Sequence, residues 1–229
     1  MSRGWWLLVT GTGRCGTGYI AHVLSSAGIR CSHEGIFSPH KNADGIRMPP
    51  GLATDEEIMY RVRTRMANPA WSWQAESSWL AAPYLDREEL QGLTVVHLVR
   101  SPKPTIDSMC RQGGLGYQHI GGLYFQFSAR YEPEALGIED PGARMAHYYT
   151  QWNRRIEPYA DIRWRVEDDV QGLLDLLGID YQGRDLFSNT RYNSRVGYFE
   201  SDVNLAELPE PIRGNLREMT ERYGYEWTA

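Results

Sequence analysis

Three glycines and one arginine near the start of the chain form a pattern that could bind an anion. Gly11, Gly13 and Gly16 spell G-x-G-x-x-G within the stretch VTGTGRCGTGY, and Arg14 lies among them. Glycines that follow a buried strand let backbone N–H groups approach a phosphate, and the dipole of the next helix favours negative charge there. The pattern therefore predicts a phosphate-binding loop, but it does not say which phosphate compound is bound.

Several compounds remain open for this loop. The glycines fit the dinucleotide fingerprint, and Glu34 stands eighteen residues after the last of them, where an acid could bind the adenosine ribose. A Walker A loop does not fit, because Thr17 follows Gly16 where that motif needs a lysine. A dinucleotide loop has no use for Arg14, whereas a group-transfer enzyme uses such a guanidinium to stabilise the leaving group. Arg14 as an ordinary surface arginine also stays open.

A second possible anion site lies in the stretch LVRSPKPTIDSM. Arg100 ends an apolar run that predicts a buried strand, and open α/β sheets bind ligands at the carboxyl ends of such strands. Ser108 follows eight residues later, about two turns into a helix that Ser101 would cap and Pro102 would begin. Arg100 and Ser108 together could hold a second phosphate. The alternative is a rim salt bridge at Arg100 and an ordinary helix serine.

The hydrophobic pattern predicts an α/β fold around these residues. We expect one three-layer domain over residues 1–229, with a central, mostly parallel β-sheet flanked by helices. The expected strands are Trp5–Thr10, Ile29–Ser32, Trp71–Ala75, Thr94–Arg100 and Ile162–Val166. The expected helices are Gly16–Ala27, Asp55–Met66, one from Pro102, Pro141–Tyr159, Asp168–Leu177 and Leu208–Tyr223. The segments Gly35–Ala53, Gln112–Gly137 and Asn189–Ser201 are expected to be irregular, the first as a functional loop and the second as a mobile segment.

Composition limits the partners and the compartment. The net charge of -5 argues against a nucleic-acid-binding protein, which would usually be basic. Cys15, Cys31 and Cys110 form no C-x-x-C pair, and three cysteines do not suggest a disulfide framework. The run WWLLV is too short for a secretion signal, and no stretch approaches the length of a membrane span. We therefore expect a cytoplasmic protein without a metal site.

Both anion motifs resemble those of one enzyme family. The stretch GRCGTGY resembles the 5′-phosphosulfate loop of the PAPS-dependent sulfotransferases, and VRSPKPTIDSM resembles their 3′-phosphate motif. Further on, WNRRIEPYADIRWRVEDDVQGLLDLLGI resembles the family's R-Y-E-D-L strand and the following helix. The resemblance covers most of the chain. It implies a P-loop-like phosphosulfate-binding fold and the transfer of a sulfuryl group from PAPS to a hydroxyl or amine, with PAP as product and no metal.

The resemblance also assigns residues to the nucleotide. Arg14 takes the place of the loop's catalytic cation, as in the tyrosylprotein branch, and Arg100 and Ser108 would hold the 3′-phosphate. Arg195 would complete that pocket, with Arg191 as its competitor. Tyr19 falls where an aromatic often lies near the adenine, although a tyrosine packed in the helix core is the alternative. The loop residues expected at the nucleotide are Gly13, Arg14, Cys15, Gly16, Thr17, Gly18 and Tyr19.

A glutamate after the second strand serves as the base in the tyrosylprotein branch and in bacterial relatives, and Glu34 matches it. His33 is the competitor, because an imidazole has a suitable pKa. Side chains alternate along a strand, so we expect only one of the two to face the site. The sequence also departs from the family, because AESSW has no lysine where relatives carry one. Ser77 and Ser78 could contact sulfate or acceptor, or they could cap the next helix.

The acceptor remains open. Five aromatic and histidine side chains in the second predicted loop suggest a pocket for a sugar, a phenol or a lipid-like group; the alternative is that they only anchor the loop. These residues are Tyr117, His119, Tyr124, Phe125 and Phe127. Two other functions stay open: an NAD(P)-dependent oxidoreductase with Glu34 on the ribose, and a nucleotide-binding module that has lost its catalytic activity.

Overall fold

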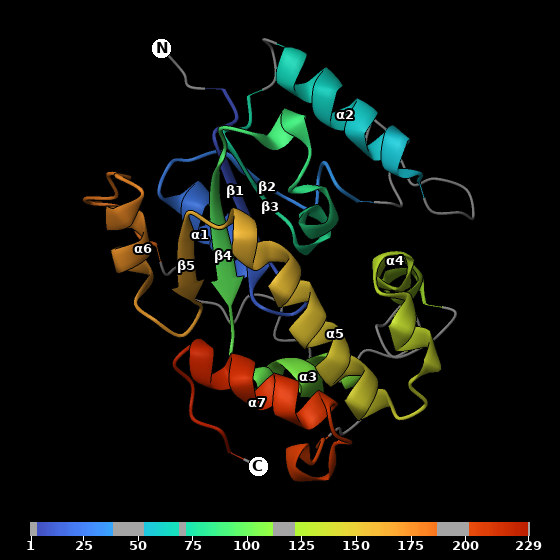
Figure 1. The fold of residues 1–229 in the computed structure, drawn as a ribbon. Helices are drawn as coiled ribbons and strands as arrows, with labels where there is room; N and C mark the ends of the chain where they lie inside the picture. Colours follow the sequence, from blue (N-terminus) through green and yellow to red (C-terminus); the bar gives the residue numbers. More distant parts are fainter. Residues whose placement is uncertain (1–3, 39–52, 69–71, 112–121, 187–201, 229) are drawn as a thin grey trace. The chain divides into compact units, whose positions relative to one another are not determined.

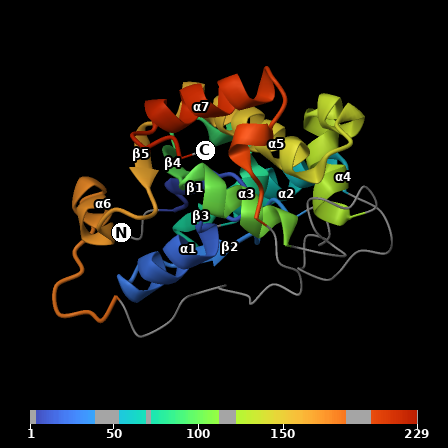
Figure 2. The same cartoon turned by 90° about the horizontal axis from the view of Figure 1, so that it is seen from below.

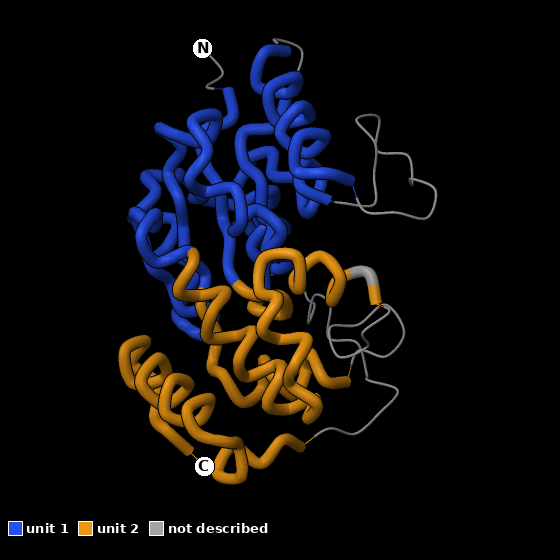
Figure 3. The backbone as a smooth tube through the Cα atoms, turned by 45° about the vertical axis from the view of Figure 1, so that its right-hand side comes forward, with its two compact units in different colours: residues 1–11, 16–98, 156–194 blue, residues 12–15, 99–155, 195–229 orange. Residues whose placement is uncertain are grey.

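A computed structural model of the chain describes residues 4–38, 53–68, 72–111, 122–186 and 202–228 (Figure 1). The chain divides into two compact units (Figure 3). Unit 1 comprises residues 1–11, 16–98 and 156–194, and unit 2 comprises residues 12–15, 99–155 and 195–229. A single domain over residues 1–229 stays a prediction.

Five strands form one parallel sheet in the order β2-β3-β1-β4-β5 (Figure 1). Their bounds are Leu7–Gly11 for β1, Cys31–His33 for β2, Ala75–Ser77 for β3, Thr94–Val99 for β4 and Ile162–Arg165 for β5. All five residues of β1 are buried, as expected for a central strand covered on both faces. Helices flank the sheet, so the predicted α/β fold with a central parallel sheet is confirmed.

The third strand differs from the sequence-based prediction. We predicted Trp71–Ala75, whereas β3 runs over Ala75–Ser77. Its residues pair with both neighbours, and Glu76 lies opposite Leu8 of β1 and Ser32 of β2. Pairing with two strands distant in sequence places this polar stretch inside the sheet, where local preference alone would not put a glutamate.

The helices of unit 1 follow the predicted pattern closely. Helix α1 spans Thr17–Ser26 and packs against β1, β2 and β3 (Figure 2). Helix α2 spans Asp55–Ala67, and α6 spans Val170–Leu176. Two 3₁₀ helices, Trp79–Tyr84 (η1) and Glu88–Leu90 (η2), connect β3 to β4.

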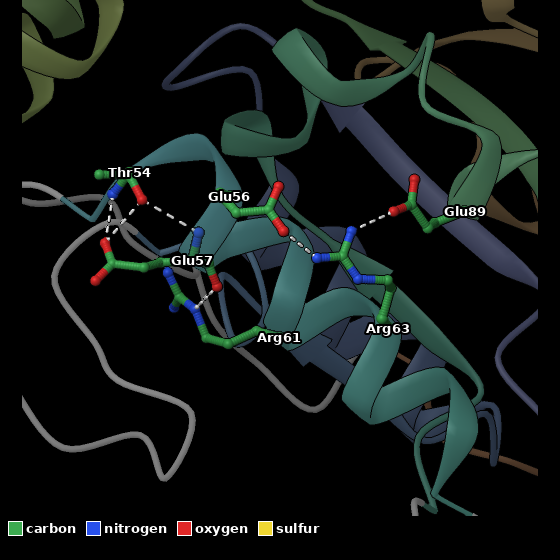
Figure 4. A network of polar contacts seen from close by, with 6 residues as sticks. All are labelled: Thr54, Glu56, Glu57, Arg61, Arg63 and Glu89. Carbon is green, nitrogen blue, oxygen red and sulfur yellow. Dashed lines mark hydrogen bonds and ion pairs between the residues drawn. The ribbon is translucent and has the colours of Figure 1, made fainter.

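Helix α2 begins with a capping box (Figure 4). The Thr54 hydroxyl accepts a hydrogen bond from the backbone N–H of Glu57 at 3.2 Å, and the Glu57 carboxylate accepts one from the N–H of Thr54 at 2.7 Å. These backbone and side-chain bonds from Thr54 lower the pKa of Glu57. Further along the helix, Arg63 bonds to the carboxylates of Glu56 and Glu89, so it links α2 to η2 (Figure 4).

Unit 2 is helical. Its helices are α3 (Pro102–Cys110), α4 (Leu123–Tyr131), α5 (Pro141–Ile156) and α7 (Ile212–Arg222), and α5 continues into the 3₁₀ helix η4 (Glu157–Tyr159). Ser101 occupies the N-cap position of α3 and Pro102 its first turn, as predicted, but the Ser101 side chain makes no capping hydrogen bond. None of the helices in the described ranges has the length and apolar character that crossing a membrane requires.

Helix α4 was not predicted. The sequence suggested an irregular segment over Gln112–Gly137, yet residues 123–131 form α4 and Pro133–Gly137 form the 3₁₀ helix η3. The ring of Phe127 packs against Trp152 of α5 with centroids 6.2 Å apart, and Tyr131 lies 6.3 Å from the same tryptophan. This aromatic packing with α5 stabilises a helix whose own sequence shows little periodicity.

Candidate functional site

The glycine loop contributes residues 12–15 to unit 2, where they form a tight turn against α5. The N–H of Cys15 bonds to the carbonyl of Thr12 at 3.3 Å, and the N–H of Gly13 donates to the Tyr148 hydroxyl at 3.4 Å. Burial raises the pKa of Tyr148 well above its ordinary value, so this hydroxyl stays neutral. Gly13 and Cys15 are buried, and Arg14 between them is half-buried.

Two arginines and a serine from the predicted anion motifs meet in unit 2. The Nε of Arg14 donates a hydrogen bond to the Ser108 hydroxyl at 2.9 Å. The Nη1 of Arg100 donates to the backbone carbonyl of Arg14 at 3.0 Å. The Tyr149 hydroxyl in turn donates to the carbonyl of Arg100 at 2.7 Å. The loop and the second motif are therefore joined by direct hydrogen bonds.

The expected phosphate clamp of Arg100 and Ser108 stays a prediction, and the two side chains make different contacts in the structure. The hydrogen-bond partner of Ser108 is Arg14, and Arg100 reaches the loop's backbone instead. Among the residues that the structure describes, no carboxylate pairs with Arg100. The rim salt bridge that was the alternative for Arg100 is therefore absent from the described part of the chain.

The start of α1 lies in unit 1 and has the features of an anion-binding helix terminus. Gly16 is the N-cap residue with φ of 105°, and the first turn of α1 carries no acidic side chain. A Cβ at Gly16 would lie 2.8 Å from Cγ2 of Val166, so glycine is required both by the backbone conformation and by space. Thr17 and Gly18 are buried at the helix start, where backbone N–H groups lack intrahelical partners.

Tyr19 is half-buried on the same helix. Burial raises the pKa of its hydroxyl, and the nearby Asp169 raises it further. The ring is therefore neither fully packed into the core nor fully exposed, and its place near an adenine stays a prediction.

A row of polar contacts connects the start of α1 to the end of β2. The Thr17 hydroxyl lies 3.3 Å from Nε2 of His33, and the same nitrogen lies 3.5 Å from Oε1 of Glu34. The side chains of His33 and Glu34 are 33% and 22% exposed, so solvent or a substrate can reach both. A proton on Nε2 of His33 would therefore lie next to Thr17, which is a candidate phosphate-binding residue, and next to Glu34, the candidate base.

The expected alternation of His33 and Glu34 is wrong. Strand β2 ends at His33, and Glu34 adopts left-handed backbone with φ of 53°. The chain therefore turns after His33 and brings the two side chains together, which an extended strand would not do. In the described residues, Arg14 with φ of 69° is the only other non-glycine residue in this region of backbone space. Such conformations are uncommon and cluster at functional sites.

Sequence reasoning did not identify Glu76 as a site residue. Glu76 lies in β3 and is completely buried, with its carboxylate bonded to the Ser32 hydroxyl and to the N–H of Ile36 at 3.2 Å. Burial raises its pKa to about 7, and the charge of Glu34 adds to the shift. A single glutamate before two serines was the available sequence signal, but it gave no indication of burial.

The two serines after Glu76 have structural partners. The Ser77 hydroxyl donates to the Thr17 carbonyl at 2.8 Å, and the Ser78 hydroxyl accepts from the N–H of Leu80 at 3.3 Å. Ser78 therefore caps η1, as one alternative proposed. Ser77 connects β3 to the first residue of α1.

Part of the predicted site lies outside the described residues. Arg191, Arg195, Tyr117 and His119 belong to this group. The chain is described again from Asp202, which pairs with Lys103 of α3. Of the predicted acceptor aromatics in α4, Phe125 and Phe127 are buried, which fits their alternative role in packing, and Tyr124 is half-buried.

The three cysteines are free and buried. Burial and the charge of Glu76 raise the pKa of the Cys31 thiol, so this sulfur stays protonated. Within the described ranges, no group of three or more histidine, cysteine, aspartate or glutamate side chains is arranged to hold a metal ion.

Comparison with known protein families finds no family model that matches the chain, and no curated protein matches it either. The fold and the local contacts therefore define the class as an α/β protein with a central parallel sheet.

Proposed function

We propose that the protein transfers a sulfuryl group from PAPS to a hydroxyl or amine of an acceptor and releases PAP. The hydrogen bond between Arg14 and Ser108 is the observation that carries this proposal. It unites the loop arginine with the second motif, and Arg100 approaches the same loop through the Arg14 carbonyl. Two arginine side chains at one short loop raise the local positive potential, which favours an anionic ligand there.

This pair of arginines favours a phosphosulfate nucleotide over a dinucleotide. Backbone N–H groups suffice to hold the pyrophosphate of NAD, so that cofactor gives no role to Arg14 or Arg100. PAPS carries a 5′-phosphosulfate and a separate 3′-phosphate. The α1 N-terminus, with Gly16, Thr17 and Gly18, suits the 5′-phosphate, and Arg100 and Ser108 suit the 3′-phosphate.

The proposed reaction is an in-line displacement at sulfur. The bond between sulfur and the bridging oxygen of PAPS breaks, and a bond forms between sulfur and the acceptor oxygen or nitrogen. The Glu34 carboxylate takes the proton that the acceptor loses, and His33 stays the competing base. Arg14 stabilises the charge that develops on the bridging oxygen, and the residues of the loop fix the geometry. Three free, buried thiols fit the expected cytoplasmic location.

A non-catalytic nucleotide-binding module is the second candidate. The observation that favours it is the segment Glu76–Trp79, which is wholly buried and offers no lysine for the transferred group. Incubation of the protein with PAPS and a panel of sugars, phenols and amines separates the two candidates. We expect acceptor-dependent release of PAP, and the rate of this release should fall by about 10²–10⁴-fold in Glu34→Gln. Tight PAP binding without turnover on any acceptor would favour the module.

A further inference from the structure

Glu76 is a buried carboxylate without a cationic partner among the described residues. The transfer of an ionised carboxylate from water to a protein interior is costly, so such groups persist only where several donors satisfy them. Here the donors are the Ser32 hydroxyl and the backbone N–H groups of Gly35 and Ile36. All three carry no charge, so the carboxylate is held by hydrogen bonds alone.

These donors stand on both sides of the two candidate bases. Ser32 precedes His33 in β2, and Gly35 and Ile36 directly follow Glu34. One carboxylate therefore holds both ends of the turn that presents His33 and Glu34. Ser77, the next residue of β3, attaches the turn as well, because the N–H of Glu34 donates a hydrogen bond to the Ser77 carbonyl at 3.3 Å.

The turn needs such support. Glu34 has left-handed backbone with φ of 53°, a conformation that is unfavourable for a residue with a Cβ atom. That conformation also brings Glu34 within 3.5 Å of His33, so loss of the turn would move the candidate base. A glutamine at position 76 keeps the shape but has a single acceptor oxygen, so it cannot accept from all three donors as a carboxylate does.

We propose that Glu76 is a positioning residue, which holds the turn after β2 by accepting hydrogen bonds from Ser32, Gly35 and Ile36. It thereby fixes the position of Glu34, the candidate base. The catalytic consequence of this positioning rests on the proposed sulfuryl transfer, whereas the effect of Glu76 on the turn does not depend on that function. Because burial and the charge of Glu34 raise the pKa of Glu76 to about 7, the carboxylate is fully ionised only above neutral pH. The other titratable groups in this cluster are His33, next to Glu34, and the Cys31 thiol.

The test compares wild-type protein with Glu76→Gln and Ser32→Ala by amide hydrogen exchange, which needs no substrate. We expect the amides of Gly35 and Ile36 to exchange at least about tenfold faster in Glu76→Gln, because an opening cost lower by about 1.4 kcal/mol gives this factor. Ser32→Ala, which removes one donor and keeps the carboxylate, should show a smaller change of the same sign. It also keeps the test possible if Glu76→Gln does not fold. Unchanged exchange at both amides would overturn the hold on the turn, whether or not the protein is a sulfotransferase.

Kinetics then test the catalytic consequence. We expect Glu76→Gln to lower kcat by about 10²-fold while the Kd for PAP changes less than about twofold, because only the base is displaced. The wild-type profile of kcat should rise through pH 7 as Glu76 ionises, and this inflection should persist in His33→Asn but disappear in Glu76→Gln. Faster exchange with an unchanged kcat would refute the positioning role. Failure of wild-type protein to bind PAP would instead refute the proposed function. The exchange data would still show whether Glu76 stabilises the turn.

Discussion

The Nε of Arg14 donates a hydrogen bond to the Oγ of Ser108, although the two residues lie 94 positions apart in the chain. A bond from Nε fixes the plane of the guanidinium, so the orientation of the loop cation depends on helix α3. The bond brings the loop arginine and the helix serine close enough to contact one ligand, as the proposed function requires.

Replacement of Arg14 tests the role of the loop cation. We expect Arg14→Ala to lower kcat by about 10²–10³-fold, the usual cost of removing one donor that stabilises a transition state. Arg14→Lys should recover only part of the rate, because an ammonium keeps the charge but lacks the planar fork. Initial rates at saturating PAPS measure both variants. Full kcat in Arg14→Ala would exclude a catalytic role for this arginine.

Replacement of Arg100 tests the site for the 3′-phosphate. A hydrogen bond to a charged group contributes about 1.5–3 kcal/mol, so Arg100→Ala should weaken PAP binding roughly 10- to 150-fold. Binding of AMP, which lacks the 3′-phosphate, should hardly change, and calorimetric titration measures both ligands. The matched control is Tyr149→Phe, which removes the hydroxyl that donates to the Arg100 carbonyl and keeps the Arg100 side chain. An equal loss of PAP and AMP affinity in Arg100→Ala would contradict the assignment.

Two parallel variants distinguish the candidate bases. We expect Glu34→Gln to reduce kcat by about 10²–10⁴-fold and to leave PAP affinity unchanged, because a general base acts on the acceptor. His33→Asn should have a smaller effect, through the contact of its ring with Thr17 and Glu34. The reverse ranking of the two variants in single-turnover assays would make His33 the base.

The capping box of α2 gives a stability prediction away from the site. Thr54→Ala should lower the melting temperature by about 2–4 °C and leave PAP binding unchanged. The bonds from Thr54 lower the pKa of Glu57, so their contribution is present above the ordinary glutamate pKa and is lost as pH falls through the lowered value. The difference in melting temperature between wild type and variant should therefore shrink in acid, which thermal scans at several pH values would show. A constant difference would mean that the Glu57 charge has no part in the cap.

The sequence was sufficient to predict much of the scaffold. Strand β1 and helix α1 follow from a continuous apolar run, a glycine turn and helical spacing, all of which are local signals. Strand β3 was misplaced and α4 was missed, because their stability comes from partners distant in the chain. Pairing with β1 and β2 stabilises the strand that contains Glu76, and packing of Phe127 on Trp152 stabilises α4.

The candidate site was only partly accessible from the sequence. Residue types and spacing selected Arg14, Arg100 and Ser108 as candidates, and the structure brings them together, but no sequence pattern encodes which of these distant residues bond to one another. Strand alternation gave the wrong relation for His33 and Glu34, because the left-handed turn at Glu34 depends on contacts with β3. The contacts of Glu76 with that turn cannot be read from the local sequence, because Ser32 and Ile36 lie at least 40 positions away in the chain.

Titration of the wild-type protein with PAP, AMP and NAD, followed by calorimetry, distinguishes a phosphosulfate nucleotide from a dinucleotide as the ligand. We expect PAP to bind at least about tenfold more tightly than AMP, because Arg100 and Ser108 add contacts to the 3′-phosphate. We also expect NAD to bind weakly or not at all. Tight binding of NAD, together with no preference for PAP over AMP, would contradict the assignment of the two motifs to a phosphosulfate nucleotide.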